Sequence, residues 1–349
     1  MTSTLAEVCT ITMGQAPTGD SYNARGEGLP LIAGAGDFKG QSLAPTKFTT
    51  KPGKISKPGD IVLSIRASIG AKVWADGEYC LGRGVAGLRA GPELDEQYLW
   101  HWLTRYERDL ASKGRGATFL QVNKTDIGEM PIMVPALAEQ RRIAAILDHA
   151  DALRAKRRQV LAHLDALTRS IFNEMFSGGG FECVALREAI KWRSGKFLPA
   201  KEQKPGAHPV FGGNGVNGSH DDYMFEEPRL VVGRVGAYCG AVHLTKPFSW
   251  VTDNALIATL LRDDLTLDYL LPALSLANLN QYAGVSGQPS ISAGKIGDAS
   301  IPVPPPELQR TFADRVAKIE IQTAVTRTAE STASDLLASL QSRAFRGEL

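Results

Sequence analysis

Two glycine-rich segments are the stretches of this sequence that come closest to a phosphate-binding motif. GRGVAG, from Gly82 to Gly87, has the GxGxxG spacing, but LRAGP follows it where a nucleotide site needs the start of a helix. FGGNGVNG, residues 211–218, lacks the Gly-Lys-Ser or Gly-Lys-Thr ending of a P-loop. Its glycines and asparagines suit a pair of tight turns at positive φ; the alternative is a loop that approaches a DNA backbone or base edge. Neither segment predicts a nucleotide cofactor.

The other residue types that carry catalysis lack the spacing that catalysis requires. No Asn- or Asp-Pro-Pro-aromatic motif of an adenine methyltransferase occurs, and no cluster of carboxylates with a nearby lysine suggests a metal-dependent nuclease. The six histidines show no HExxH spacing and the four cysteines no CxxC pair. We therefore predict a non-catalytic chain with no metal and no cofactor, and cysteines that stay reduced. These residues are His101, His149, His163, His208, His220 and His243, and Cys9, Cys80, Cys183 and Cys239.

Two long helical segments, residues 135–177 and 304–349, are expected to position everything else. They match without a gap at an offset of 169 residues, which pairs Gln140 with Gln309 and Phe176 with Phe345. The first shows a heptad pattern, and the second shows a similar but more polar seam. We predict two coiled-coil spacer helices that pair antiparallel. Heptad positions a of the first are Ile143, Ala150, Leu164 and Ile171, positions d are Ile146, Leu153, Val160 and Leu167, and the second seam runs through Phe312, Val316, Ile319, Thr323, Thr326, Ala333, Leu337, Leu340 and Ala344.

The segments 1–134 and 178–303 precede these helices as two similar globular heads. Each mixes short apolar runs bounded by Gly and Pro, which predict strands, with a helical segment such as DEQYLWHWLTRYERDLAS. The heads align at their margins, where GRVGAYCGAV matches SIRASIGAKV, and the second is shorter in its first third. The predicted fold is therefore α+β: two similar domains joined by two long antiparallel coiled-coil helices with pseudo-twofold symmetry. Two unlike heads on a twofold scaffold suit a duplex polymer with a local dyad.

Charge and hydropathy limit the class of protein. The net charge is only +2, and the heads hold 15 basic against 14 acidic residues and 11 against 12. Neither head is a basic patch in bulk, so we expect weak DNA binding by the isolated chain. No signal peptide or membrane-spanning run is visible, and a cytoplasmic location is expected.

The run PIMVPALAEQRRIAAILDHADALRAKRRQVLAHL and its reprise SIPVPPPELQRTFADRV strongly resemble the specificity subunit of type I restriction-modification systems. GDIVLSIRASIG, HPVFGGNGVNG and GRVGAYCG in the heads agree with the resemblance. It implies two target-recognition domains, each reading one half of a bipartite, asymmetric sequence in double-stranded DNA. It also implies helices that set the spacing and bind methyltransferase subunits, two of them expected, which in turn bring restriction and translocase subunits. The second copy departs from the signature, with Leu308 at the position of Glu139.

Residue type and loop context select candidates for these contacts, since Arg and Lys suit guanine or phosphate and Asn and Gln suit adenine. A rival hypothesis is a coiled-coil scaffold whose heads bind proteins or glycans. The basic cluster RAKRRQ, residues 154–159, is a solvated helix face, a partner surface or a phosphate contact. The candidates for DNA are Arg25, Lys39, Arg66, Lys72, Arg115, Gln121, Asn123 and Lys124 in the first head, and Lys196, Lys201, Lys204, Asn214, Asn217, Arg234, Tyr238, Gln288 and Lys295 in the second. The candidates for partner subunits are Glu139, Gln140, Arg141, Gln309 and Arg310.

Overall fold

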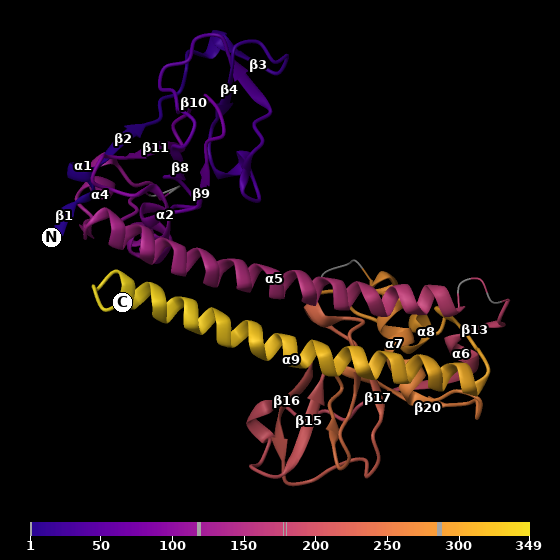
Figure 1. The fold of residues 1–349 in the computed structure, drawn as a ribbon. Coiled ribbons are helices and arrows are strands. Elements are labelled where there is room, and N and C mark those ends of the chain that lie inside the picture. The colour runs from indigo at the N-terminus through magenta and orange to yellow at the C-terminus, as the bar shows by residue number, and fades with distance from the viewer. Residues whose placement is uncertain (1, 117–119, 177, 179, 285–287) are drawn as a thin grey trace. The chain divides into compact units, whose positions relative to one another are not determined.

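A computed structural model describes residues 2–116, 120–176, 178, 180–284 and 288–349 (Figure 1). The chain forms two compact units, and each takes half of both long helices. Unit 1 comprises Met1–Arg157 and Ala329–Leu349, and unit 2 comprises Arg158–Thr328. The long helices are α5, Leu137–Phe176, and α9, Pro306–Ala344. The split differs from the predicted domains because each head packs on segments of both long helices.

Unit 1 is built on an antiparallel sheet in the order β2-β11-β8-β9. Its strand β8 is buried at every position, which explains its unbroken apolar run Ile-Val-Leu. A second sheet, β10-β4-β7-β3, lies at the end of the unit away from α5, whereas α1, α2 and α4 lie beside the start of α5 (Figure 1). The strands are β1 Thr2–Thr4, β2 Cys9–Met13, β3 Tyr22–Asn23, β4 Leu29–Ile32, β5 Phe38–Lys39, β6 Ser42–Leu43, β7 Lys47–Thr49, β8 Ile61–Ser64, β9 Lys72–Trp74, β10 Cys80–Leu81, β11 Val85–Ala90 and β12 Pro131–Met133, and the helices are α1 Leu5–Val8, α2 Glu96–Arg105, α3 Glu107–Ser112 and α4 Lys124–Gly128, with short η1 Gly19–Ser21 and η2 Ala35–Asp37.

Unit 2 repeats this plan with the sheet β14-β20-β17-β18. Its second sheet, β16-β15-β19, keeps one parallel strand pair as the β10–β4 pair does, and within the described residues it has no counterpart of β3 or of the β5–β6 hairpin. This difference fits the shorter first third of the second head. The strands are β13 Cys183–Ala185, β14 Ile190–Ser194, β15 His208–Gly212, β16 Gly215–His220, β17 Leu230–Gly233, β18 Val242–Leu244, β19 Trp250–Val251, β20 Ala255–Leu260 and β21 Ser300–Pro302, and the helices are α6 Leu186–Ala189, α7 Leu267–Leu276 and α8 Ala293–Ile296, with short η3 Ala200–Glu202, η4 Gly236–Tyr238 and η5 Leu279–Tyr282.

A buried glutamine joins the head of unit 1 to the start of α5. The Gln140 side chain is fully buried; its Oε1 accepts from the Asp95 N–H at 2.8 Å. Its Nε2 donates to the carbonyls of Glu93 and Pro135, both at 2.8 Å. Asp95 is also the N-cap of α2, where its side chain accepts from two helix N–H groups. One side chain therefore satisfies backbone groups at the starts of both helices.

Unit 2 uses the same joint. Gln309 is also fully buried, and its Oε1 accepts from the backbone N–H of Thr266, the N-cap of α7, at 3.0 Å. Its Nε2 donates to the carbonyls of Asp264 and Pro304 at 2.6 and 2.9 Å. The glutamine match found in the sequence thus marks one structural device used twice.

In each unit, an aromatic residue at the C-terminal end of one long helix packs against the head and the start of the other long helix. In unit 1, Phe345 from the end of α9 packs edge-on against Tyr98 of α2 with ring centroids 5.1 Å apart. In unit 2, Phe176 from the end of α5 packs edge-on against Tyr269 of α7 at 5.5 Å and against Phe312 at 5.3 Å. The start of each long helix therefore lies beside the end of the other, and the predicted antiparallel pairing is confirmed within each unit.

The residues predicted to form the buried seam are covered on α9 but only partly covered on α5. Every predicted seam residue of α9 is buried or half-buried. On α5, position a is mostly covered, but three of the predicted d residues are exposed: Leu153 at 40%, Val160 at 43% and Leu167 at 43%. A strict a/d seam for α5 is therefore wrong, because its first turns bury Ile143 and Leu147, which are four residues apart, against the head.

Candidate nucleic-acid interface

A pair of backbone segments in unit 1 brings three of the candidate residues together. The Ala67 N–H donates to the Leu120 carbonyl at 3.2 Å, and the Gln121 N–H donates to the Arg115 carbonyl at 3.0 Å. The Arg66 Nε then donates to the Gln121 Oε1 at 2.6 Å. Ala67 has a φ of 55°, which turns the chain sharply after Arg66. Arg66, Arg115 and Gln121 form one polar cluster, which we call the first loop pair.

Unit 2 repeats the backbone of this cluster with other side chains. The Gly236 N–H donates to the Pro289 carbonyl at 2.9 Å, and the Gly284 N–H donates to the Ser290 carbonyl at 2.9 Å. Gly236 has a φ of 80°, so it takes the turn that Ala67 takes in unit 1. Around this second loop pair lie Tyr238, which is 55% exposed, and Gln288, whose Nε2 is close to Gly236.

A cavity of about 470 Å³ opens beside Arg66 in unit 1. Lys47 and Arg83 line it with Arg66, and the backbone of residues 33–36 forms another wall. Gly84 permits this wall to approach, since a Cβ there would lie 2.2 Å from the Ala33 carbonyl oxygen. Sequence reasoning missed Lys47 and Arg83. Arg83 lies inside GRGVAG, between Gly82 and Gly84. The arginine between two glycines could have indicated a basic loop at this position, whereas the GxGxxG spacing suggested only a nucleotide motif.

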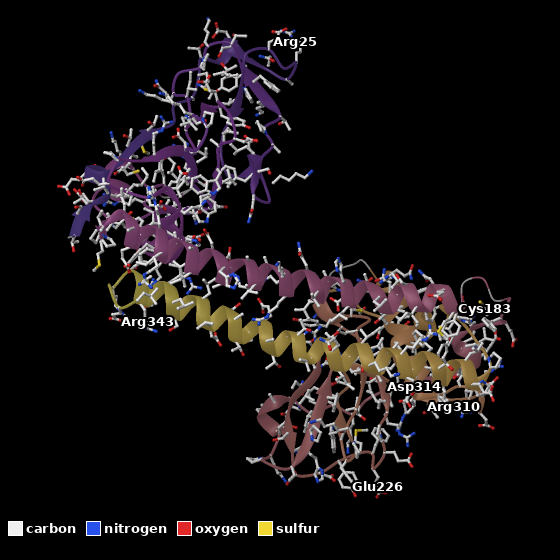
Figure 2. All side chains as sticks on the ribbon, in the orientation of Figure 1. Arg25, Cys183, Glu226, Arg310, Asp314 and Arg343 are labelled. Carbon is white, nitrogen blue, oxygen red and sulfur yellow. The ribbon has the colours of Figure 1, made fainter. Side chains whose placement is uncertain are left out.

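The remaining candidates of the first head do not join this cluster. Arg25 projects from the tip of the unit and pairs with Glu27, and Lys39 is exposed on β5 (Figure 2). Asn123 is occupied as the N-cap of α4, which Lys124 begins. Lys72 is half-buried on β9, with its Nζ 4.7 Å from the centre of the Trp100 ring. Burial lowers the pKa of Lys72 to about 8, so this lysine has an internal role in the unit.

The candidates of the second head fall into two groups. Arg234 and Lys295 lie at the second loop pair: the Arg234 carbonyl accepts from the Ile291 N–H at 2.8 Å, and the Lys295 Nζ is close to Gly284. The other group belongs to the β16-β15-β19 sheet and its approach. There Lys196 covers the Trp250 ring at 5.1 Å and Lys204 pairs with Asp221 at 3.7 Å. The exposed residues Lys201, Asn214 and Asn217 complete this group.

The candidates for partner binding separate by burial. Gln140 and Gln309 are fully buried in the joints, so their side chains are not available to a partner in this fold. Arg141 and Arg310 are exposed, and Glu139 pairs with Arg142 at 2.6 Å. That pairing lowers the pKa of the Glu139 carboxyl. The basic cluster is partly engaged within unit 1, where Arg154 pairs with Asp151 at 2.6 Å and Arg157 donates to the Ala329 carbonyl at 2.9 Å.

The residues that the structure describes form no metal site, disulfide or membrane-spanning helix. No group of three or more His, Cys, Asp or Glu there has metal-binding geometry. The four cysteines are free thiols, and burial raises the pKa of Cys9 to about 12, which keeps it protonated. In the described ranges, no helix is long and apolar enough to span a bilayer.

Comparison with known proteins agrees with the repeat. The family model of the type I restriction modification DNA specificity domain matches twice, at residues 1–163 and 179–332. The chain is 32% identical over 169 residues to a protein described as the type I restriction enzyme MjaX specificity subunit of Methanocaldococcus jannaschii, covering 48% of this chain and 40% of that relative. It is 29% identical over 201 residues to the type I restriction enzyme EcoprrI specificity subunit of Escherichia coli, covering 54% and 50%. The matches thus span half or less of the length of these relatives.

Solved structures share the fold along the whole chain. The S subunit of a type I restriction-modification system from M. genitalium superposes with a TM-score of 0.65 at 17% identity, covering 99% of this chain and 96% of that one. A chain from a study of complex assembly and conformational transition of the type I R-M system superposes with a TM-score of 0.61 at 20% identity, covering 100% and 98%. With the family model matching both repeats, the chain belongs to the family of type I restriction-modification DNA specificity proteins.

Proposed function

We propose that this chain is the sequence-recognition subunit of a type I restriction-modification complex, in which each head reads one half of a bipartite, asymmetric DNA target. In this role it is non-catalytic: it selects the site and methyltransferase subunits modify the DNA. Restriction and translocase subunits join through the methyltransferase subunits. The proposed role places the chain in the cytoplasm, where reduced cysteines persist.

One observation carries the proposal: the two loop pairs share a backbone and differ in side chains. Arg66 occupies the position of Val235, Arg115 that of Gly284, and Gln121 that of Ser290, as the matched backbone bonds define them. A framework kept while its polar side chains change is expected of two readers that meet different base sequences.

The side chains of the first loop pair suit base contact. An arginine reads guanine through O6 and N7, and a glutamine reads adenine through N6 and N7. The bond between Arg66 and Gln121 holds both groups in a fixed orientation, which reduces the entropy lost on binding. Lys47 and Arg83 in the adjoining cavity supply charge for a phosphate.

The long helices support the recruitment of partners. Leu153, Val160 and Leu167 are exposed at intervals of seven residues along α5, which is the spacing that a partner helix covers in a coiled coil. Arg141 and Arg310 add exposed charge at the starts of the two helices. We propose that these surfaces bind the methyltransferase subunits.

Exchange of one head tests the function. The chain is reconstituted with its methyltransferase, and N6-methyladenine is mapped on a DNA library; residues 178–303 are then replaced by the corresponding head of another specificity subunit. We expect one half of the methylated motif to change while the other half is retained. A motif that changes in both halves would contradict independent reading, and the absence of any sequence-selective methylation would favour a scaffold that does not read DNA.

A further inference from the structure

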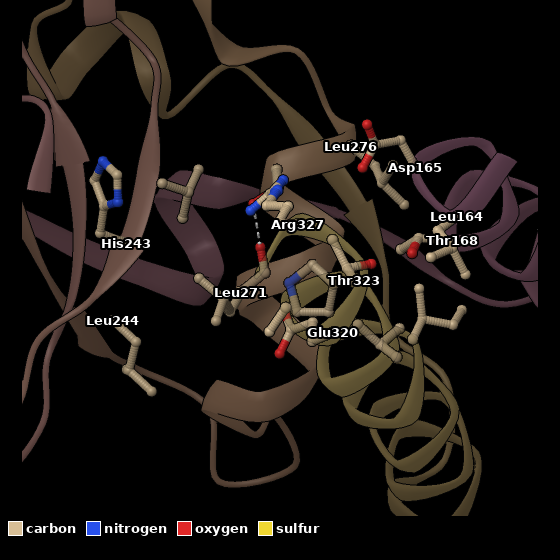
Figure 3. A pocket seen from close by; sticks show the side chains of 16 residues that line it. Leu164, Asp165, Thr168, His243, Leu244, Leu271, Leu276, Glu320, Thr323 and Arg327 are labelled. Carbon is tan, nitrogen blue, oxygen red and sulfur yellow. Dashed lines mark hydrogen bonds between the residues drawn. The ribbon is translucent and has the colours of Figure 1, made fainter. Parts of the chain in front are cut away.

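A groove between the head helix and the two long helices occurs in both units, and in unit 1 side chains fill the part of it beside Trp100 and His101. In unit 2, α7, β18 and the long helices enclose a groove of about 610 Å³ (Figure 3). In unit 1 the corresponding space beside Trp100, His101 and Asp151 has only about 120 Å³, and a separate cavity of about 780 Å³ adjoins it at Thr104 and Gln341. The volume of the unit 2 groove falls in the range of ligand and side-chain binding sites.

Strand register and hydrogen bonds establish which residues correspond. Val242 and Leu244 on β18 pair with β17 as Lys72 and Trp74 on β9 pair with β8. On the head helices, the Thr104 hydroxyl donates to the Trp100 carbonyl, and the Ser275 hydroxyl donates to the Leu271 carbonyl. Leu271 therefore occupies the position of Trp100. On the long helices the matched joints make Glu320 the counterpart of Asp151.

In unit 1, aromatic rings and a cation fill the groove. Trp74 and Trp100 stack with centroids 4.9 Å apart, and the Lys72 ammonium covers the Trp100 ring. The carboxylates of Glu107 and Asp151 both attract this ammonium, and Asp151 also pairs with Arg154 at 2.6 Å. His101 adds a bond from its Nε2 to the Asp148 Oδ1 at 2.8 Å, which ties the head helix to α5.

In unit 2, each of these filling groups is absent. Leu244, Leu271 and Val242 replace the two tryptophans and the lysine, and Pro272 stands where His101 stands. The acid remains: Glu320 lines the groove, joined by Asp165 from α5, and neither has an ion pair within the described residues. The unit thus keeps the carboxylate and lacks the lysine and the rings that accompany it in unit 1.

Arg327 and His243 are the other groove residues that can carry a positive charge, and within the described residues neither forms an ion pair with Glu320. Arg327 lies seven residues after Glu320 on α9, about 10 Å along the axis. His243 is held neutral because burial lowers its pKa. Its ring lies against Gly215 of β16, on the face of β18 opposite to Val242 and Leu244, so this side chain does not take the place of Lys72.

We propose that the groove of unit 2 is a docking site for a partner protein segment that presents an aromatic side chain beside a lysine or arginine. The aromatic ring takes the place of the Trp74–Trp100 stack, and the cation takes the place of Lys72 against Glu320. The two carboxylates disfavour a nucleic-acid strand in the same groove. The site is distinct from the loop pairs and goes beyond the proposed reading of DNA.

A fluorinated indole amine tests the site without DNA. Binding of 5-fluorotryptamine to the full chain is followed by fluorine NMR, and we expect saturable binding at one site per chain. Leu271→Trp fills the groove as in unit 1 and should weaken binding at least about tenfold. Leu261→Trp is the matched control, because Leu261 is 54% exposed in the same unit and should leave binding unchanged.

The charge is tested by an isosteric change. Glu320→Gln should weaken binding of the amine roughly threefold and leave the uncharged 5-fluorotryptophol unaffected. A peptide acetyl-Lys-Gly-Trp-Gly-amide should displace the probe, and its counterpart with Asp in place of Lys should not. Absence of saturable binding, equal binding by Leu271→Trp and by the native chain, or displacement by random duplex DNA would each overturn the proposal. Because Glu320 is exposed, its variant keeps the test valid if Leu271→Trp fails to fold.

Discussion

Units 1 and 2 agree in the residues that join a head to its helices and differ in the residues that face outward or line the groove. Gln140 and Gln309 make the same bonds, and Tyr98 and Tyr269 donate to equivalent carbonyls, those of Met133 and Pro302, at 2.9 and 2.7 Å. By contrast, Trp100 in one groove is Leu271 in the other. The shared residues are buried and satisfy backbone groups, so any change there is costly in either unit.

The residues that the two units share hold each head to its helices, whereas the residues that differ between the units are those we propose to contact DNA or a partner. The loop pairs and the grooves differ in side chains between the units, while the backbone bonds of the loop pairs are the same. Two questions then become testable. One is whether the shared joints contribute equally to stability, and the other is whether the unlike positions affect only their own unit.

The largest effect is expected from removing a joint. Gln140→Ala leaves the Asp95 N–H and the carbonyls of Glu93 and Pro135 without partners, so we expect a loss of roughly 3 kcal/mol or more. Gln309→Ala should cost a similar amount in unit 2. Urea unfolding of each variant measures the loss.

Gln159→Ala provides the control, since Gln159 is exposed on the same helix as Gln140. Its change in stability should stay within about 0.5 kcal/mol. If Gln140→Ala cost less than this control, the joint would not be what secures the head to α5.

The second prediction concerns a substitution that gives unit 1 the leucine found at the same position of unit 2. Trp100→Leu removes the stack with Trp74 and opens the groove, at a cost of about 2 kcal/mol. The variant should also acquire a binding site for the uncharged 5-fluorotryptophol, because Lys72 still occupies the position of the cation. Loss of stability with no new site would show that size alone does not make the groove of unit 2 a docking site.

The sequence predicts the joints better than the grooves for a physical reason. Gln140 and Phe176 recur at a fixed offset because both repeats must satisfy the same backbone bonds, so the matched helices and the α+β heads followed from the sequence. The Trp74–Trp100 stack joins a strand and a helix that are separated in the chain, and no local sequence pattern predicts it. The heptad pattern of α5 likewise did not reveal that Leu153 remains exposed, because an apolar side chain at position d does not specify which protein covers it.

A third effect concerns reading of DNA by one head. Arg66→Ala removes a candidate guanine contact and the bond that orients Gln121, and we expect a loss of about 1 to 3 kcal/mol in discrimination at that half-site. Methylation rates of the reconstituted complex on duplexes altered in one half or the other measure the discrimination. Arg108→Ala, an exposed arginine on α3, is the control. Equal loss at both half-sites would contradict independent heads.

The smallest effect isolates the buried cation of unit 1. In the folded chain the pKa of Lys72 is about 8 against an ordinary value of 10.5, because burial outweighs the attraction of Glu107 and Asp151. Between these two pH values the unfolded chain binds the additional proton, so this lysine makes stability rise as pH increases from about 8 to 10.5. Below pH 8 the full cost of burying the charge is present.

Lys72→Met should therefore be more stable than the native chain at pH 7, by about 1 kcal/mol once the lost contact with the Trp100 ring is subtracted. The advantage should shrink through the same pH window and vanish above it. Urea unfolding of both chains at pH 7, 9 and 10.5 follows the difference, which removes the contribution of other titrating groups. A constant difference across this range would mean that Lys72 keeps its ordinary pKa, and that the cation in the unit 1 groove is held without the burial that distinguishes it from an exposed charge.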